Sequence, residues 1–197
     1  MASAVIHLCV ATLVSQKTNK RSLELLIGSI APDIAKYIGE NKMKTHFQDY
    51  NNDLPNLKLF LDKYSNYMND DFVLGYYIHL YTDYLWYKYF MNKYLNNNYK
   101  LSKKEFVYYL YNDYTNLNVE LIEDYNITLD IFYNEIPLIN NIIEEIPMNK
   151  INIIIDEMGK IIKNSKKNKT NFLKLKEVEL FIDLAKEAIY NEVKLWL

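Results

Sequence analysis

The sequence has few of the residues that interrupt helices or cross-link a chain. Its 197 residues include 4 glycines, 4 prolines and a single cysteine, Cys9. One cysteine excludes an internal disulfide bond, which agrees with a reducing compartment. So little glycine and proline argues against a fold made of many tight turns and favours long helices. We therefore expect an all-α fold.

The chain also lacks an excess of charge of one sign and long uncharged apolar runs. Its formal net charge is −2, so charge does not indicate a nucleic-acid partner. No apolar segment reaches about 18 residues without a charge, so no transmembrane helix is expected. The apolar start has no basic region before it and is interrupted by His7. We therefore expect a retained helix rather than a signal peptide, and a cytoplasmic protein.

Hydrophobic residues, by contrast, are abundant, at 50% of the chain. A chain of this length can bury a full core as one domain. We expect a single all-α domain over residues 1–197, a multi-helix bundle with a metal site in its core. The half that would carry the metal site spans about 1–95, and packing helices span about 100–197. Oligomeric state is not indicated.

Apolar periodicity and capping residues place the expected helices. They span about residues 3–16, 22–29, 57–64, 70–95, 102–125, 128–136, 139–146, 151–162 and 175–196, with short helices opened by Pro32 and by residues 45–47. Ser102 and Glu105 form a capping-box pattern. Residues 36–44 are expected to form a polar loop, and residues 163–171 a flexible basic connection.

The central helix carries a histidine and an acid inside an aromatic run. His79 and Asp83 are four residues apart, so they share one helix face. Burying them alone would be costly, so they need polar partners. The other two histidines, His7 and His46, also have apolar neighbours, and Asp33 follows an Ile-Ala-Pro segment.

Metal binding is one explanation for these five residues, which are His7, Asp33, His46, His79 and Asp83. Imidazole nitrogen and carboxylate oxygen are good zinc ligands, and helices of a bundle can present them to one core site. Other divalent transition metals accept the same ligands. In the simpler alternative, each histidine is a hydrogen-bonded core residue and Asp33 is only a helix cap.

The order of these residues resembles the zinc-dependent phospholipase C family, which is related more distantly to the S1/P1 nucleases. The shared pattern is His7 in a first helix, a GxxxPD segment ending at Asp33, His46 before an aromatic residue, and GYxxHxxxD ending at Asp83. The pattern covers about the first 90 residues. The family's fold is all-α.

The resemblance implies one or two zinc ions and a phosphodiester or phospholipid substrate, with nucleotides included through the nucleases. His46, His79 and Asp83 would hold one ion, and Asp83 would bridge to a second ion bound by His7. Asp33 would be a ligand or the general base, so Asp33 and Asp83 are the expected catalytic residues.

The chain departs from the secreted enzymes of this family in two respects. Those enzymes use an amino terminus exposed by cleavage as a metal ligand, whereas six residues precede His7 here. They also have a further zinc site made of later histidines, and this chain has no histidine after His79. We therefore expect one or two metal ions and not three.

Three functions are compatible with the pattern. The first is a zinc-dependent hydrolase that uses a metal-activated water. The second is a helical binding protein, metal-stabilised or metal-free, that retains the scaffold without catalysis; a structural metal site in it would be closed rather than open. The third, an HD-type phosphohydrolase, is disfavoured because no histidine is followed by aspartate.

Overall fold

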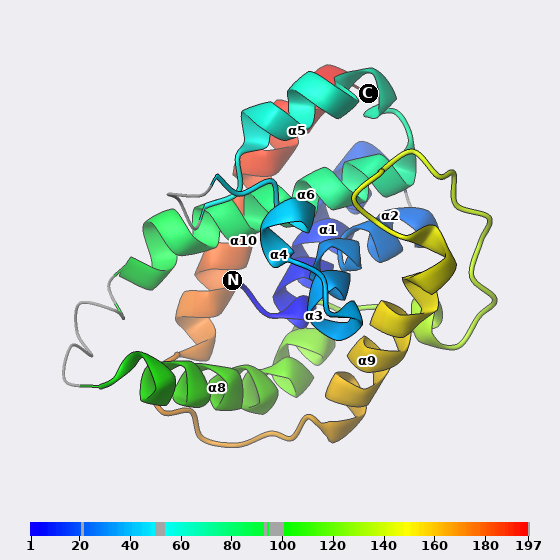
Figure 1. The fold of residues 1–197 in the computed structure, drawn as a ribbon. Coiled ribbons are helices and arrows are strands. Elements are labelled where there is room, and N and C mark those ends of the chain that lie inside the picture. Colours follow the sequence, from blue (N-terminus) through cyan, green and yellow to red (C-terminus); the bar gives the residue numbers. More distant parts are fainter. Residues whose placement is uncertain (21, 50–53, 93, 95–100, 197) are drawn as a thin grey trace.

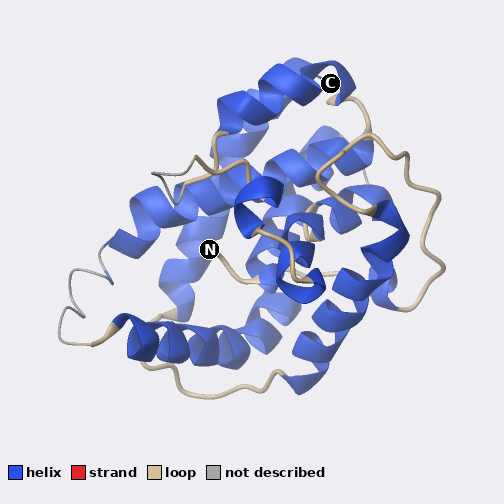
Figure 2. Cartoon of the chain, viewed as in Figure 1, coloured by secondary structure: helices blue, strands red, loops and turns tan. Residues whose placement is uncertain are grey.

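Helix α6 (Asp71–Leu85) crosses the middle of the molecule, and the other helices pack around it (Figure 1). The computed structural model describes residues 1–20, 22–49, 54–92, 94 and 101–196. Over these ranges the chain is mostly helical and forms no strand, apart from one isolated bridge between Gln48 and Pro55 (Figure 2). The expected all-α fold is confirmed. Within the same ranges, no helix is long and apolar enough to cross a bilayer.

The remaining elements follow in chain order. They are α1 (Ala4–Thr18), α2 (Leu23–Gly28), η1 (Ala31–Ile34), α3 (Ala35–Ile38), α4 (Lys42–Thr45), α5 (Leu57–Tyr64), η2 (Ser65–Tyr67), η3 (Trp86–Met91), α8 (Lys103–Asp124), η4 (Asp130–Phe132), η5 (Met148–Lys150), α9 (Ile151–Asn164), α10 (Leu175–Val193) and η6 (Lys194–Trp196). The η elements are 3-10 helices except η3, which is a π-helix that continues α6.

Helices α1 and α6 are buried around most of their circumference, because apolar residues occupy most of their faces. Helix α1 is N-capped by Ser3 and packs against α6, α8 and α10. Helix α6 is N-capped by Asp70, whose carboxylate accepts hydrogen bonds from the backbone of Phe72 and Val73. Just beyond α6, Trp86 is fully buried and packs against Phe90, Phe181 and Tyr114.

Two glycines bring α2 and α6 into backbone contact. A Cβ atom at Gly28 would lie 2.2 Å from the carbonyl oxygen of Phe72, and one at Gly75 would lie 2.0 Å from that of Leu25. Any larger side chain would push the two helices apart. The crossing therefore fixes the segment after α2, which includes Ser29, against the face of α6.

The segment between α9 and α10 is bound along α8 by hydrogen bonds. The buried Asp113 carboxylate accepts four of them, from the backbone of Asn171, Phe172 and Leu173 and from the Asn171 amide group. The Asn116 amide donates to the carbonyl of Lys169 at 3.1 Å. The expected flexible connection at residues 163–171 is thus the end of α9 followed by an ordered strap.

Several other expectations about local structure are wrong. Residues 139–146 form an irregular segment instead of a helix, because Tyr64 of α5 binds its backbone at Glu144 and Ile143 packs into the core. Residues 128–136 contain only the short η4. The expected loop at 36–44 includes the end of α3 and most of α4. Helix α4 ends at Thr45, where a helix was expected to begin. The expected end of the central helix near residue 95 lies outside the described residues.

Candidate metal centre

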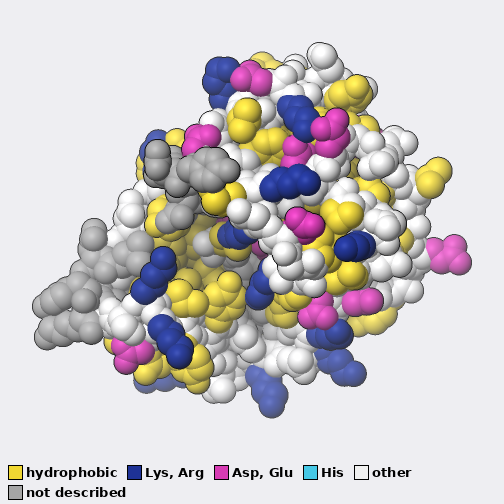
Figure 3. Space-filling model, viewed as in Figure 1, with side chains coloured by type: hydrophobic (Ala, Val, Ile, Leu, Met, Phe, Trp, Pro, Cys, Tyr) yellow, Lys and Arg dark blue, Asp and Glu magenta, His cyan; other side chains and the backbone are white. Residues whose placement is uncertain are grey.

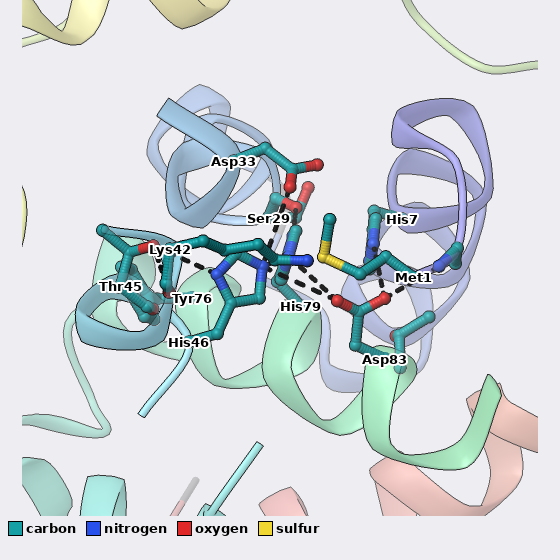
Figure 4. Close-up of polar contacts among 12 residues, drawn as sticks. Met1, His7, Ser29, Asp33, Lys42, Thr45, His46, Tyr76, His79 and Asp83 are labelled. Atoms are coloured by element: carbon teal, nitrogen blue, oxygen red, sulfur yellow. Dashed lines mark hydrogen bonds and ion pairs between the residues drawn. The ribbon is translucent and has the colours of Figure 1, made fainter. Parts of the chain in front are cut away.

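Four segments of the chain bring the five expected site residues together (Figure 4). His7 projects from α1, Asp33 from η1, and His46 from the C-cap of α4. His79 and Asp83 project from one face of α6. The three histidines are fully buried, and Asp83 is only 2% exposed. The cluster therefore lies in the protein interior, where charged and polar groups need partners.

His79 is oriented by a backbone carbonyl group at the α2–α6 crossing. Its Nδ1 atom lies 2.8 Å from the carbonyl oxygen of Ser29. A carbonyl oxygen only accepts hydrogen bonds, so Nδ1 carries the proton. The lone pair of the neutral ring is then on Nε2, which points into the cluster. A metal-binding histidine is usually oriented in this way, by a hydrogen bond from its other ring nitrogen to a carbonyl or carboxylate oxygen.

His46 is oriented in the same way by its neighbour Thr45. When the Thr45 hydroxyl donates its proton to the carbonyl oxygen of Lys42 at 3.2 Å, it accepts a hydrogen bond from His46 Nδ1, 3.0 Å away. If the hydroxyl instead turned to His46, Nε2 of His46 would carry the proton that faces His79. In the first arrangement the lone pair of neutral His46 is also on Nε2, and both histidines present lone pairs to the cluster. The two Nε2 atoms of His46 and His79 are 3.2 Å apart. Two lone pairs at this distance repel each other unless a cation lies between them.

A shared proton does not supply that cation at neutral pH. Burial lowers the pKa of His46 to about 3, and the positive charge of Lys42 adds to this effect. Burial also lowers the pKa of His79 well below its usual range. Both rings are therefore neutral at pH 7 and offer two lone pairs to a metal ion.

Asp83 supplies a third donor at a matching distance. Its Oδ2 atom lies 3.6 Å from His46 Nε2 and 3.7 Å from His79 Nε2, and has no hydrogen-bond partner among the described residues. Donor atoms about 2.0–2.1 Å from a tetrahedral zinc ion are about 3.4 Å apart. The three donor–donor distances of 3.2, 3.6 and 3.7 Å bracket this value.

The other oxygen of Asp83 faces His7. The distance from Asp83 Oδ1 to His7 Nε2 is 3.3 Å, and the His7 ring stacks on the His79 ring with centroids 3.7 Å apart. Neither ring nitrogen of His7 has a hydrogen-bond partner within the described part of the chain. Burial alone would raise the pKa of Asp83. The interaction with His7 outweighs burial and holds this pKa well below its usual range. Asp83 is thus an ionised carboxylate with one oxygen directed at each side of the cluster.

Asp33 connects the cluster to a surface cavity. Its Oδ1 atom is 3.7 Å from His46 Nε2, and its side chain is 14% exposed. Burial raises the pKa of Asp33, against the opposing charges of His7 and Lys42. The same residue lines a cavity of about 360 Å³. Asp33 is the member of the cluster that both contacts the donor atoms and lines this cavity.

The cavity is mainly apolar with polar groups at its edge. Its lining includes Tyr111, Tyr114, Met158, Ile161 and Lys36. The Lys36 ammonium lies 5.2 Å from the ring centroids of both Tyr37 and Tyr111, a cation–π arrangement. In Figure 3, hydrophobic side chains gather in a hollow near the position at which Figure 1 marks the N-terminus, and no histidine is visible on this face.

Residues 1–3 lie between the cavity and the buried histidines. The Ala2 backbone N–H donates to Asp83 Oδ1 at 2.8 Å, and the Tyr114 hydroxyl donates to the Met1 carbonyl at 2.7 Å. Figure 4 shows the Met1 side chain directed into the cluster. This segment shields His7 and Asp83 from solvent, so Asp33 is the exposed edge of the centre.

The donor set fits a divalent transition metal. Two carboxylates, of which Asp83 has its pKa held well below its usual range, would balance a divalent charge, and the imidazoles of His46 and His79, whose pKa values are lowered, would complete a nitrogen and oxygen shell of the kind zinc prefers. Unpartnered buried atoms on His7 and Asp83 would otherwise be costly. His46, His79 and Asp83 can hold one ion, and His7 with Asp83 can contribute to a second.

The residues that orient the donors were not identified from the sequence. Ser29 acts through its backbone carbonyl, which no side-chain pattern reveals. Lys42, one turn before His46, lies in the expected polar loop at residues 36–44, and Thr45, directly before His46, lies at the expected start of a short helix. The Thr-His adjacency was the one signal available.

No known protein family, curated protein or solved structure matches this chain.

Proposed function

We propose that the chain is a zinc-dependent hydrolase of phosphodiester or phospholipid-type substrates. The observation that carries the proposal is the spacing of the three donor atoms of His46, His79 and Asp83, which agrees with tetrahedral zinc. The ordered motifs that resemble the zinc-dependent phospholipase C family support the same reaction class. Charge gives no indication of a nucleic-acid substrate.

A bound zinc ion would acidify a water molecule to a pKa of about 7 and polarise a phosphoryl oxygen. His46 and His79 would hold that ion through Nε2 while Thr45 and Ser29 keep their rings in place. Asp83 would bridge toward His7. Asp33, at the boundary with the cavity, would accept the proton of the attacking water, and its raised pKa suits a general base.

The cavity beside Asp33 suits the organic part of the substrate. Its apolar wall of Tyr114, Met158 and Ile161 can receive an acyl or aryl group, while Lys36 at the edge can contact an anionic head group. The substrate would therefore enter from the cavity, with its phosphoryl group nearest Asp33.

The burial of the histidines favours a second candidate function, a non-catalytic helical protein with a closed structural metal site. Residues 1–3 cover the cluster, and a closed shell of protein ligands is typical of structural zinc. The two functions differ in whether Asp33 acts on a substrate.

The test combines zinc binding with hydrolysis of bis(p-nitrophenyl) phosphate. Wild-type protein is expected to bind one or two equivalents of zinc, and to release p-nitrophenol only when zinc is bound. Asp83→Asn should lower zinc binding and activity together. Asp33→Asn should keep its zinc but lose about 10²- to 10⁴-fold in kcat, the usual range for a general base.

Asp71→Asn, at the half-buried start of α6 where Asp71 pairs with Lys20 at 3.0 Å, is the matched control outside the cluster and should bind zinc and turn over substrate as wild type does. Zinc binding without turnover in the wild-type protein would favour the closed structural site. Absence of zinc binding in the wild-type protein would contradict both candidates that need a metal.

A further inference from the structure

Lys42 is a cation directed at the candidate metal centre. It opens α4, one turn before His46, and its carbonyl oxygen accepts hydrogen bonds from the His46 backbone at 3.0 Å and from the Thr45 hydroxyl at 3.2 Å. These bonds fix the Lys42 backbone relative to the His46 ring. Figure 4 shows the half-buried Lys42 side chain extending past that ring toward the middle of the cluster.

The charge of Lys42 acts on the candidate ligands. It lowers the pKa of Asp33 and also that of His46, in each case as one of several contributions beside burial. Lys44, two residues further along the same helix, is exposed. Lys36 contacts tyrosine rings at the cavity edge.

The chemistry of an ammonium in this position is informative. If the Lys42 ammonium served only to neutralise Asp33, it would oppose metal binding, because it repels a divalent ion. An ammonium at this position beside the candidate ligands is also suited to contact the phosphoryl oxygens of a substrate, because those oxygens carry the charge that develops during phosphoryl transfer. A flexible lysine can serve as a point charge for phosphate.

We propose that Lys42 is an anion-binding residue of this centre, which partly balances its carboxylates without metal and contacts a phosphoryl oxygen once metal is bound. The inference rests on the proposed function and adds a specificity element to it. The ligand it selects is an anionic phosphate or phosphate ester. A neutral carboxylic ester offers no comparable charge and should not depend on Lys42.

Two binding measurements with opposite expected signs test this proposal. Zinc affinity is measured by competition with a chromophoric chelator, and inorganic phosphate affinity is then measured on the zinc-loaded protein. Lys42→Met should bind zinc at least about fivefold more tightly, because a repelling charge is gone. It should bind phosphate at least about tenfold more weakly, because an ionic hydrogen bond is lost.

The control variants separate charge from structure. Lys44→Met, on the same helix, should match wild type within about twofold in both measurements, and Lys42→Arg should retain most of the phosphate affinity. A Lys42→Met protein that binds zinc more weakly, or that binds phosphate as wild type does, overturns the proposal. If zinc binds to none of these proteins, the proposed function fails as well, so the two failures are distinguishable.

Discussion

At the scale of single residues, the centre depends on which ring nitrogen carries each proton. Ser29 and Thr45 accept hydrogen bonds from the Nδ1 atoms of His79 and His46, so both Nε2 lone pairs face inward. These two contacts direct both lone pairs to the middle of the cluster, where a metal ion could bind. A buried histidine pair linked through one proton would need one of these contacts to be reversed.

His46 makes the stability of the metal-free protein depend on pH. Burial lowers its pKa from 6.5 to about 3. Between these values the unfolded chain binds a proton that the folded protein excludes. The free energy of unfolding contributed by His46 is therefore fully present above about pH 6.5 and falls by about 1.4 kcal/mol for each pH unit below it.

Urea unfolding of metal-free wild type and His46→Gln between about pH 4 and 7 would measure this contribution. The pH slope of the unfolding free energy should be smaller in the variant by about one proton. Asp33, whose raised pKa gives a slope of the opposite sign above its ordinary value, is present in both proteins. Equal slopes would mean that folded His46 is protonated across this range.

At the scale of elements, the crossing of α2 and α6 positions a hydrogen-bond partner of the site. Gly28 and Gly75 allow backbone contact, and the next residue after α2, Ser29, thereby reaches His79 on the following turn of α6. The glycines of the GxxxPD and GYxxHxxxD segments thus have a structural role that is independent of any reaction.

Gly75→Ala is expected to damage both stability and metal binding. Its Cβ would lie 2.0 Å from the Leu25 carbonyl oxygen and 3.0 Å from the Ser29 nitrogen, both backbone atoms that cannot rotate away. Separating the helices should cost about 1–3 kcal/mol and withdraw the Ser29 carbonyl from His79. Thermal unfolding and zinc titration would measure the two effects.

Gly159→Ala in α9 is the matched control. Its added methyl group would lie 3.6 Å from Phe132 Cδ1, an ordinary contact, so the change should be neutral or stabilise the helix by about 0.5–1 kcal/mol. A Gly75→Ala protein as stable as wild type would show that the crossing tolerates a wider separation.

The elements also show what the sequence could predict. Long periodic segments such as α1, α8 and α10 were predicted closely, and the Ser102–Glu105 capping box is confirmed. Residues 139–146 have the same apolar periodicity but are too short to hold a helix against a partner, Tyr64, that binds their backbone. The strap on α8 was missed because Asp113 contacts residues about 60 positions away.

The site was predictable to a similar extent. Spacing places His79 and Asp83 on one face of a helix, and the scarcity of histidine draws attention to His7 and His46. The structure brings these residues and Asp33 together, whereas metal binding by them stays a prediction. The distances among donor atoms and the tautomers of the rings depend on tertiary contacts, so no local pattern could give them.

At the scale of the whole molecule, the centre joins segments that are far apart in the chain. Its donors come from α1, η1, α4 and α6, and the cavity beside it is completed by α8 and α9. The expected division into a metal-site half and a packing half therefore does not describe the cavity, which has residues of both parts in its wall.

Metal binding should consequently stabilise the whole fold. A ligand that binds only the folded state adds about 4 kcal/mol when it is present at roughly a thousandfold its Kd. For a chain of this size we expect zinc to raise Tm by about 10 °C. Calorimetry with zinc and with a chelator would measure the shift, which should vanish in Asp83→Asn. A wild-type Tm that does not respond to zinc would contradict metal binding.

The position of Trp86 has an optical consequence. Its indole is fully buried, and its ring centroid lies 6.2 Å from that of Tyr114, which lines the cavity. Trp196, the other tryptophan, packs against Tyr77 in a different part of the molecule. In a Trp196→Phe protein, ultraviolet emission would come from one native fluorophore directly behind the cavity wall. Entry of a molecule into the cavity could then be followed by the change in Trp86 fluorescence, without any attached dye.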